Sequence, residues 1–212
     1  PNEPRLLMNY ALALSRLWFY GDGEAAGQAM AAAERLVAVQ PGRAESHMSL
    51  ASIRFQAADL LGAEQALAQA LALRPEFADA HELQGRLLIE TGPVQRGMEH
   101  LAWARRLDPG LFRVVADQAR VLALLNRTER AHELLADHAA VEPTFAILWI
   151  LRGRLCLWQR DSQRAAAYLQ DPEIQSNKYP RARLLLQVTQ RHTRVDPQEV
   201  MAAGLASDKS SP

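Results

Sequence analysis

The residues best suited to catalysis or metal binding in this chain are six histidines and one cysteine. His47 and His81 occupy equivalent places of a repeated pattern, thirty-four positions apart, which favours a packing role. His132 and His138 are six positions apart, so on one helix their side chains point in different directions and make a poor metal pair. Cys156 lies between two leucines, where a small buried hydrophobic residue is the usual outcome.

The sequence motifs that carry enzymatic chemistry are missing from this chain. It has no glycine-rich phosphate loop, no nucleophile elbow and no His-Glu-x-x-His motif. A single cysteine can form neither an internal disulfide nor a multi-cysteine metal site. We therefore expect no enzymatic activity, no catalytic residue, no metal ligand and no cofactor.

Binding chemistry is better represented, by three arginines at a constant spacing of thirty-four positions: Arg86, Arg120 and Arg154. If this spacing reflects a structural repeat, the three side chains form a column on one surface. Neighbouring helices pack about 8–10 Å apart, and an extended peptide advances about 3.3 Å per residue. Acidic side chains at roughly every third residue of a peptide would then meet the guanidinium groups, which bind carboxylates through paired hydrogen bonds.

Ion pairs within a helix are the alternative for two of these arginines. Glu82 and Glu90 lie four positions before and after Arg86, and Asp117 lies three positions before Arg120. Side chains at these spacings are neighbours on a helix surface and can pair with one another. In that case the arginines belong to a solvated, internally neutralised face and do not bind a ligand.

Arg154 differs from the other two, because Ile150 and Trp158 occupy the positions four before and four after it. No acidic side chain is available at these spacings, so Arg154 is the best single candidate for contact with a ligand. Stacking on the Trp158 ring is the alternative use of its guanidinium group.

The same spacing of thirty-four positions separates four prolines: Pro41, Pro75, Pro109 and Pro143. A fixed period of this length predicts a stacked array of repeated helical units. In the second repeat, residues 44–55 and 60–73 have helical periodicity, and residues 57–59 are expected to form the turn between them. Because proline lacks an amide hydrogen and disfavours a helical conformation in the residue before it, each proline is expected just after the second helix of a repeat.

Small residues recur with the same period and predict where paired helices approach closely. In the first helix of successive repeats they are Ala51, Gly85, Ala119 and Gly153. In the second helix they are Ala29, Ala63, Gly97, Ala131 and Ala165. The space between repeats is expected to be filled by the larger residues Leu67, Leu101, Leu135 and Leu169.

This pattern resembles the tetratricopeptide repeat, a helix-turn-helix unit with the same period of thirty-four. The residues that match the family's pattern in the third and fifth repeats are Gly85, Gly92, Ala104, Leu107, Asp108, Pro109, Trp149, Gly153 and Ala165. Three positions depart from it: His47 and His81 stand where an aromatic residue is usual, and His138 replaces an alanine. The resemblance implies an all-α, right-handed solenoid of helix-turn-helix repeats.

The repeat pattern predicts a single solenoid domain over residues 1–206, beginning with a helix over residues 5–20 that Pro4 starts. Its five repeats span residues 10–43, 44–77, 78–111, 112–145 and 146–171. The pattern breaks at Asp171 and Pro172. Beyond them, residues 180–206 are expected to form C-terminal capping helices, and residues 207–212 a tail or linker.

In solenoids of this family the first helices of the repeats line a concave surface, so the resemblance implies a partner-binding groove there. The residues expected in it are Phe55, Glu82, Arg86, Ile89, Arg120, Arg154 and Trp158. The lysine and asparagine set with which some family members clamp acidic chaperone tails is absent from the corresponding positions. Apolar groups, with Trp18 and Leu157 among them, instead indicate a mixed groove suited to an extended segment or a helix.

Composition limits the kinds of partner. Twenty-four basic residues balance 24 acidic ones, which argues against binding to nucleic acid or to an anionic membrane surface. No apolar run reaches the roughly 18–20 residues of a membrane span. No signal peptide is recognised at the start of the sequence, which favours a cytoplasmic location but leaves a periplasmic one open.

We therefore predict a non-catalytic scaffold that binds a partner protein or peptide, with acidic residues, in its concave groove. The alternative is a regulatory or self-association module of a larger protein, which forms a homodimer through its outer face or its cap. Only the alternative predicts a dimer in the absence of a ligand.

Overall fold

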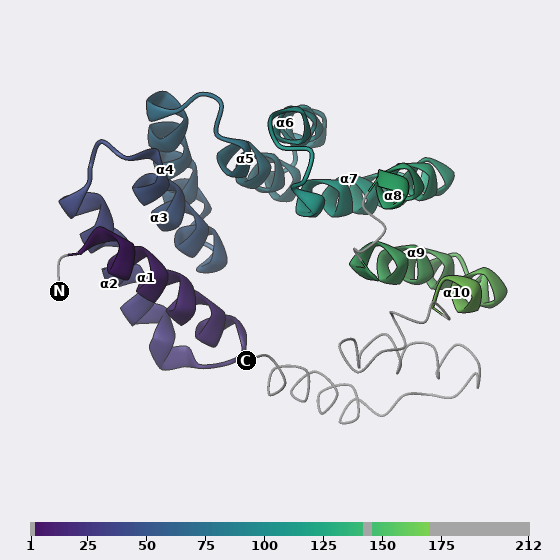
Figure 1. Ribbon diagram of the computed structural model, residues 1–212, viewed down its shortest axis with the longest axis horizontal. Helices are drawn as coiled ribbons and strands as arrows, with labels where there is room; N and C mark the ends of the chain where they lie inside the picture. Colours follow the sequence, from purple (N-terminus) through teal and green to yellow (C-terminus); the bar gives the residue numbers. More distant parts are fainter. Residues whose placement is uncertain (1–2, 142–145, 170–212) are drawn as a thin grey trace. The chain divides into compact units, whose positions relative to one another are not determined.

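The computed structural model describes residues 3–141 and 146–169, which fold into ten helices joined by short turns (Figure 1). They divide into two compact units, residues 1–114 and 115–212, and each is described by itself. The predicted break at Asp171 and Pro172, the capping helices at 180–206 and the tail at 207–212 lie outside the described residues. The assignment of residues 1–206 to one solenoid domain stays a prediction.

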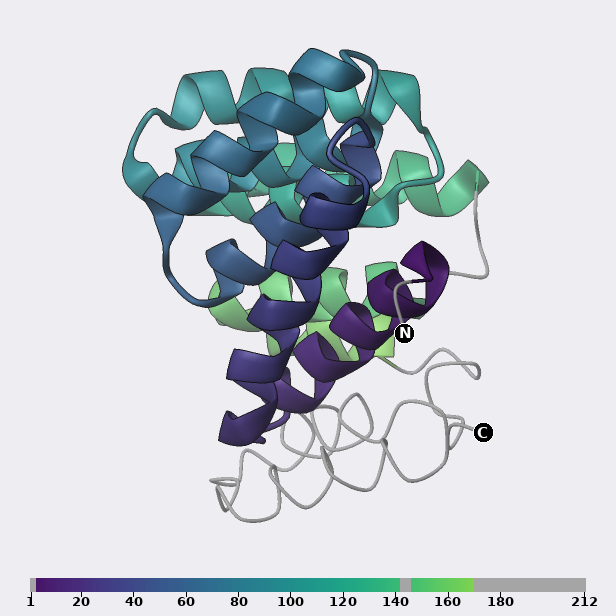
Figure 2. The same ribbon diagram turned by 90° about the vertical axis from the view of Figure 1, so that its left-hand side faces the viewer.

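Unit 1 consists of three helix pairs and the start of a further helix. The pairs are α1 (Pro4–Phe19) with α2 (Gly23–Val39), α3 (Ala44–Gln56) with α4 (Leu60–Leu73), and α5 (Ala78–Thr91) with α6 (Val94–Leu107). Figures 1 and 2 show α1 and α2 side by side at the N-terminal end of this unit. The helices predicted at 44–55 and 60–73 are confirmed as α3 and α4, with α3 one residue longer than expected.

Unit 2 begins within α7 (Phe112–Leu124) and continues with α8 (Thr128–Val141), α9 (Ala146–Trp158) and α10 (Ser162–Leu169). Helices α9 and α10 pack together as a pair, like the consecutive helices of unit 1. A core of buried side chains from α7, α8 and α9 holds the unit together: Val115, Ala119, Ala131, Leu135, Ala139, Leu148 and Leu155. The all-α fold class is thus confirmed over the described residues.

Each turn between paired helices contains a residue with a positive φ angle. Ala58, Gly92, Asn126 and Arg160, which follow one another at the repeat period, have φ angles of 59°, 113°, 59° and 63°. This left-handed conformation suits glycine and costs an ordinary L-residue roughly 1–2 kcal/mol. In the first turn the left-handed residue is Gly21, at a φ angle of 105°. It precedes Ala58 by three positions more than the period, so α1 is displaced from the register of the other repeats.

The ends of the helices follow from local sequence, as predicted. Glu3 caps α1 by accepting a hydrogen bond from the backbone N–H of Leu6 at 2.7 Å, and Pro4 occupies the first turn. Gln40, Arg74 and Asp108, which end α2, α4 and α6, each precede a proline and have non-helical backbone angles. The repeat prolines of unit 1 therefore follow the second helices, where they were expected.

Glycines let the helices of a pair approach closely, which confirms the expectation drawn from the small residues. A Cβ atom added at Gly85 would lie 2.8 Å from Cγ of Leu101 and 2.9 Å from the carbonyl oxygen of Gly97. The backbones of α5 and α6 are therefore in direct contact. In unit 2 a Cβ atom at Gly153 would meet the side chain of Leu169 at 2.8 Å. The larger residues at the repeat position of Leu101 are completely buried in every case: Leu67, Leu101, Leu135 and Leu169.

Three of the described histidines and the cysteine make contacts within the fold. His47 and His81 each donate from Nε2 to the carbonyl oxygen of a repeat proline, Pro41 and Pro75, at 2.8 Å, so the bond itself recurs with the repeat. His132 and Cys156 are buried beside each other, with 3.7 Å between Nε2 and Sγ. Burial raises the pKa of the Cys156 thiol, which favours its protonated form.

Candidate partner-binding grooves

Unit 2 contains a groove of about 780 Å³ between its first helices, and we call it the unit 2 groove. Its walls are formed by α7 and α9, and Leu135 of α8 lies at its base. Apart from charged and aromatic groups, the lining is apolar. It consists of Ala116, Asp117, Ala119, Arg120, Leu124, Leu135, Leu151, Arg154, Leu155, Leu157 and Trp158.

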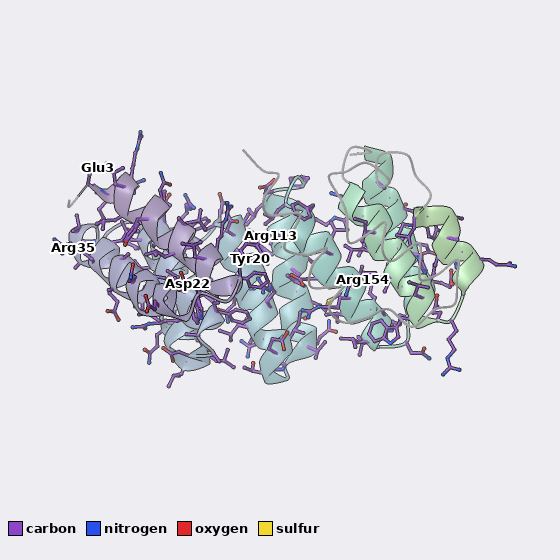
Figure 3. The ribbon with its side chains drawn as sticks, turned by 90° about the horizontal axis from the view of Figure 1, so that it is seen from below. Glu3, Tyr20, Asp22, Arg35, Arg113 and Arg154 are labelled. Carbon is purple, nitrogen blue, oxygen red and sulfur yellow. The ribbon has the colours of Figure 1, made fainter. Side chains whose placement is uncertain are left out.

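The two arginines of this groove are in different states. Arg120 pairs with Asp117 on the same helix at 3.3 Å, as its spacing predicted. Arg154 is exposed, and within residues 3–141 and 146–169 it makes no ion pair or hydrogen bond (Figure 3). The unit 2 groove therefore offers a positive charge that the described part of the chain does not neutralise.

Large apolar side chains at the rim of the unit 2 groove are exposed to solvent. Trp158, one turn after Arg154 on α9, is 62% exposed, and Leu124 on α7 is 61% exposed. Beneath them Ala119, Leu135 and Leu155 are buried. The predicted site residues Arg120, Arg154 and Trp158 thus come together around one apolar depression.

The predicted site residues of unit 1 form a different arrangement, centred on Arg86. Its guanidinium group lies 3.4 Å from Glu82 and 5.0 Å from the centre of the Phe55 ring. Glu82 also lies 3.9 Å from Arg113, which pairs with Asp79 at 3.0 Å (Figure 3). Arg86 is therefore held by an ion pair and a cation–π contact, as the alternative interpretation of its spacing anticipated.

Of the residues predicted to line a groove in unit 1, Glu82 instead lies in the interior, and Ile89 is only partly exposed. Glu82 is only 2% exposed, so it orients the arginines and presents no surface to a ligand. Ile89 is half-buried beside the core formed by Leu101, Ala104 and Val114. Trp18 likewise is half-buried, packed against the core of unit 1.

Unit 1 has a groove that the sequence reasoning largely missed, and we call it the unit 1 groove. It measures about 310 Å³ and is lined by Met8, Leu12, Ser15, Glu45, Met48, Ser49, Ser52, Ile53, Phe77 and Asp79. Met8 and Leu12 of α1 line it, although α1 contributed neither of them to the predicted groove. Met8 and Leu12 are four positions apart, so their sequence spacing places them on one face of a helix. The repeat period did not point to them, because α1 is displaced from the register of the other repeats.

The acids of the unit 1 groove are neutralised within the unit. Glu45 pairs with Arg74 at 2.8 Å and with Arg43 at 3.4 Å, and Asp79 pairs with Arg113. The pKa of Glu45 is lowered, first by a hydrogen bond from its own backbone amide and then by Arg74 and Arg43. This groove therefore presents methionine and leucine side chains between charges that are already paired.

Neither a metal-binding cluster nor a membrane-spanning helix occurs among the described residues. They contain no group of three histidine, cysteine, aspartate or glutamate side chains that could hold a metal ion. None of their helices has the length and apolar character that crossing a membrane requires.

Comparisons with known proteins identify the fold. No protein-family model matches the chain, and neither does any curated protein. Among solved structures it is similar to TTC0263, a thermophilic tetratricopeptide-repeat (TPR) protein of Thermus thermophilus. The identity is 18%, the match covers 89% of this chain and 99% of that one, and the TM-score is 0.73.

Two further solved structures agree with this result. A tetratricopeptide repeat protein from Parabacteroides merdae is 19% identical over 89% of this chain and 72% of that one, with a TM-score of 0.70. YrrB, described as a TPR protein with an unusual peptide-binding site, is 16% identical over 89% and 93%, with a TM-score of 0.55. The repeat period, the paired helices and these likenesses together show that the chain has the tetratricopeptide-repeat solenoid fold.

Proposed function

We propose that this protein is a non-catalytic scaffold whose unit 2 groove binds a segment of a partner protein that carries apolar side chains and a carboxylate. The observation that carries the proposal is Arg154, an exposed cation without an ion pair among the described residues, at the rim of an apolar depression. A carboxylate on the partner would supply the acid that the repeat positions around Arg154 lack.

The size and lining of the unit 2 groove support this function. A volume of about 780 Å³ lies in the range of sites that enclose small ligands or several side chains of a peptide. Tryptophan and arginine are the residue types that most often carry the binding energy of protein interfaces. A partner's leucine or phenylalanine placed against Trp158, Leu151 and Leu155 would remove apolar surface from water.

The likeness to YrrB adds weight to a peptide partner, because that repeat protein is described as having a peptide-binding site. The fold itself supports a scaffold over an enzyme, since stacked repeats present extended surfaces to other proteins. Of the three arginines at the repeat spacing, only Arg120 and Arg154 are proposed to contact the partner, because these two line the unit 2 groove. Arg86 is already engaged by Glu82 and Phe55.

The experiment is selection from a random peptide library against the full chain, followed by fluorescence anisotropy with the selected peptide. We expect peptides that combine an acidic residue with leucine or aromatic residues. Arg154→Glu should weaken their binding by about 10- to 100-fold, the effect of losing a hydrogen bond to a charged group.

The matched control for this experiment is Arg130→Glu, which reverses an exposed arginine of α8 outside the groove. It should leave the peptide affinity within about twofold, because exposed charges far from a site contribute little. Selection of the same acidic peptides by wild type and Arg154→Glu, with equal affinity, would remove the basis of the proposal.

A further inference from the structure

The first helix, α1, presents three distinct faces. Leu7, Ala11 and Leu14 are buried against the rest of unit 1, and Met8 and Leu12 line the unit 1 groove. The third face carries four residues that belong to neither the core nor a groove. We call it the α1 seam, and it consists of Leu6, Tyr10, Ala13 and Leu17.

The α1 seam is unusually apolar for an exposed surface. Leu6 is 56% exposed, Tyr10 and Leu17 are each 51% exposed, and Ala13 is exposed as well. The Tyr10 hydroxyl donates a hydrogen bond to Gln28 of α2 at 3.1 Å, which fixes the ring at the surface. In Figure 3, α1 extends between the labelled residues Glu3 and Tyr20. A contiguous apolar strip on a folded protein commonly marks an interaction site.

This side of α1 differs from the same side of the later first helices. Aligning the left-handed residues Gly21 and Ala58 places Asn9 and Arg16 of α1 at the positions of Ser46 and Ile53. Asn9 and Arg16 are exposed. In every later repeat the residues at these two positions are buried: Ser46 and Ile53, Ala80 and Leu87, Val114 and Val121, and Leu148 and Leu155.

The spacing within the α1 seam matches a helix pairing with its own copy. The four residues are separated by four, three and four positions, which is the spacing of a two-stranded coiled coil. This spacing reads the same in both directions. In an antiparallel pair Leu6 therefore lies opposite Leu17 of the second copy, and the large Tyr10 lies opposite the small Ala13 of the second copy.

We propose that α1 is a self-association element, which pairs antiparallel with α1 of a second copy through the α1 seam. Leu6 and Leu17 lie about 16 Å apart along the helix, and a seam of this length buries an area in the range of transient interfaces, below about 1,200 Å². The dimer is therefore weak and concentration-dependent. This inference goes beyond the proposed function, since the α1 seam lies in unit 1 and peptide binding uses the groove of unit 2.

Sedimentation of the full chain over a concentration series, from about 5 to 500 μM, tests the dimer. We expect a monomer–dimer equilibrium that Leu6→Glu and Leu17→Lys each weaken at least about tenfold, because each places a charge opposite a leucine. A mixture of the two variants should dimerise again, because Glu at position 6 then faces Lys at position 17. Leu61→Glu, at a leucine of α4 that is 67% exposed, is the matched control and should dimerise like wild type.

The mixing experiment also tests the antiparallel arrangement, since only an antiparallel pair places Glu at position 6 opposite Lys at position 17 and keeps Leu17 opposite Leu6 on the other side. A chain that stays monomeric at all concentrations overturns the proposal. So does a dimer that both single variants leave intact, or one that mixing fails to restore. Circular dichroism of each variant confirms that these exposed substitutions leave the fold unchanged.

Discussion

In unit 1 the arginine of the repeat, Arg86, lies between Glu82 and the Phe55 ring, whereas in unit 2 its equivalent, Arg154, faces solvent. The intermediate case is Arg120, which pairs with Asp117 but still lines the unit 2 groove. The three residues share one position of one repeat, so the backbone does not cause the difference. The side chain one helical turn away decides whether the arginine stabilises its own unit or remains available to a partner.

The two grooves also differ in whether their charged side chains are paired within the unit. The unit 1 groove has its acids, Glu45 and Asp79, neutralised by arginines of the same unit, and its apolar surface comes from flexible methionine and leucine side chains. The unit 2 groove is larger and combines a tryptophan with an arginine, Arg154, that has no ion pair among residues 3–141 and 146–169. Charge specificity is therefore expected in unit 2, and unit 1 is suited at most to apolar contact.

The largest predicted difference between the units concerns the helix contacts. Gly85→Ala should lower the free energy of unfolding of unit 1 by up to about 3 kcal/mol, because the new Cβ atom meets the backbone oxygen of Gly97. Gly153→Ala should cost less than about 1 kcal/mol, since it meets only the Leu169 side chain and gains helix propensity. Urea denaturation of both variants measures this, and equal losses would show that the two contacts are alike.

The arginine comparison predicts that the same substitution changes stability by different amounts in the two units. Arg86→Gln should destabilise the protein by about 1–2 kcal/mol, because buried Glu82 loses its ion pair with Arg86 at 3.4 Å. Arg154→Gln should change stability by less than about 0.5 kcal/mol, since no described ion pair is lost. Thermal unfolding and peptide affinity, measured on both variants, separate stabilisation from binding. If both variants lose stability equally, Arg154 has a structural partner.

The turns predict a smaller effect, shared by both units. Ala58→Gly in unit 1 and Arg160→Gly in unit 2 should each stabilise the protein by about 0.5–1 kcal/mol, because glycine removes the strain of a positive φ angle. Gly92→Ala should have the reverse effect. Differential scanning calorimetry of the three variants tests this, and a destabilising Ala58→Gly would mean that the alanine methyl group makes a contact worth more than the strain.

The smallest effect is expected from histidine protonation. Burial, followed by nearby arginines, lowers the pKa of His132 in unit 2, and burial, followed by His81 and Arg96, lowers that of His100 in unit 1. The unfolded chain therefore binds protons first, so stability is full above about pH 6.5 and falls as the pH decreases below it. Urea midpoints at pH 7 and 5.5 should differ less in His132→Gln and His100→Gln than in wild type. Equal pH dependence in all three proteins would contradict this.

The repeat period was sufficient to predict most of the fold, because a fixed spacing constrains both helices of a pair and the contact between them. Gly85 and Gly97 illustrate this, since glycine is costly inside a helix unless another backbone lies close. The displacement of α1 was not predictable from the period, because the first turn places its left-handed residue three positions early. The groove residues Met8 and Leu12 were missed for this reason.

The candidate site was predicted in part. Spacing along one helix anticipated the pairs of Arg86 with Glu82 and of Arg120 with Asp117, since both partners lie within a single turn. The burial of Glu82 was not anticipated, because it depends on Arg113, whose contribution comes from the next repeat. A local pattern cannot show a contact that only tertiary packing creates.

The left-handed turns at Ala58, Gly92, Asn126 and Arg160 have a consequence for engineering. All four residues are exposed, and the three that are not glycine keep φ angles of 59° to 63° although their side chains range from a methyl group to a guanidinium group. These turns therefore tolerate different side chains, which makes them the first places to try when a loop, an epitope or a fluorophore site is inserted between paired helices.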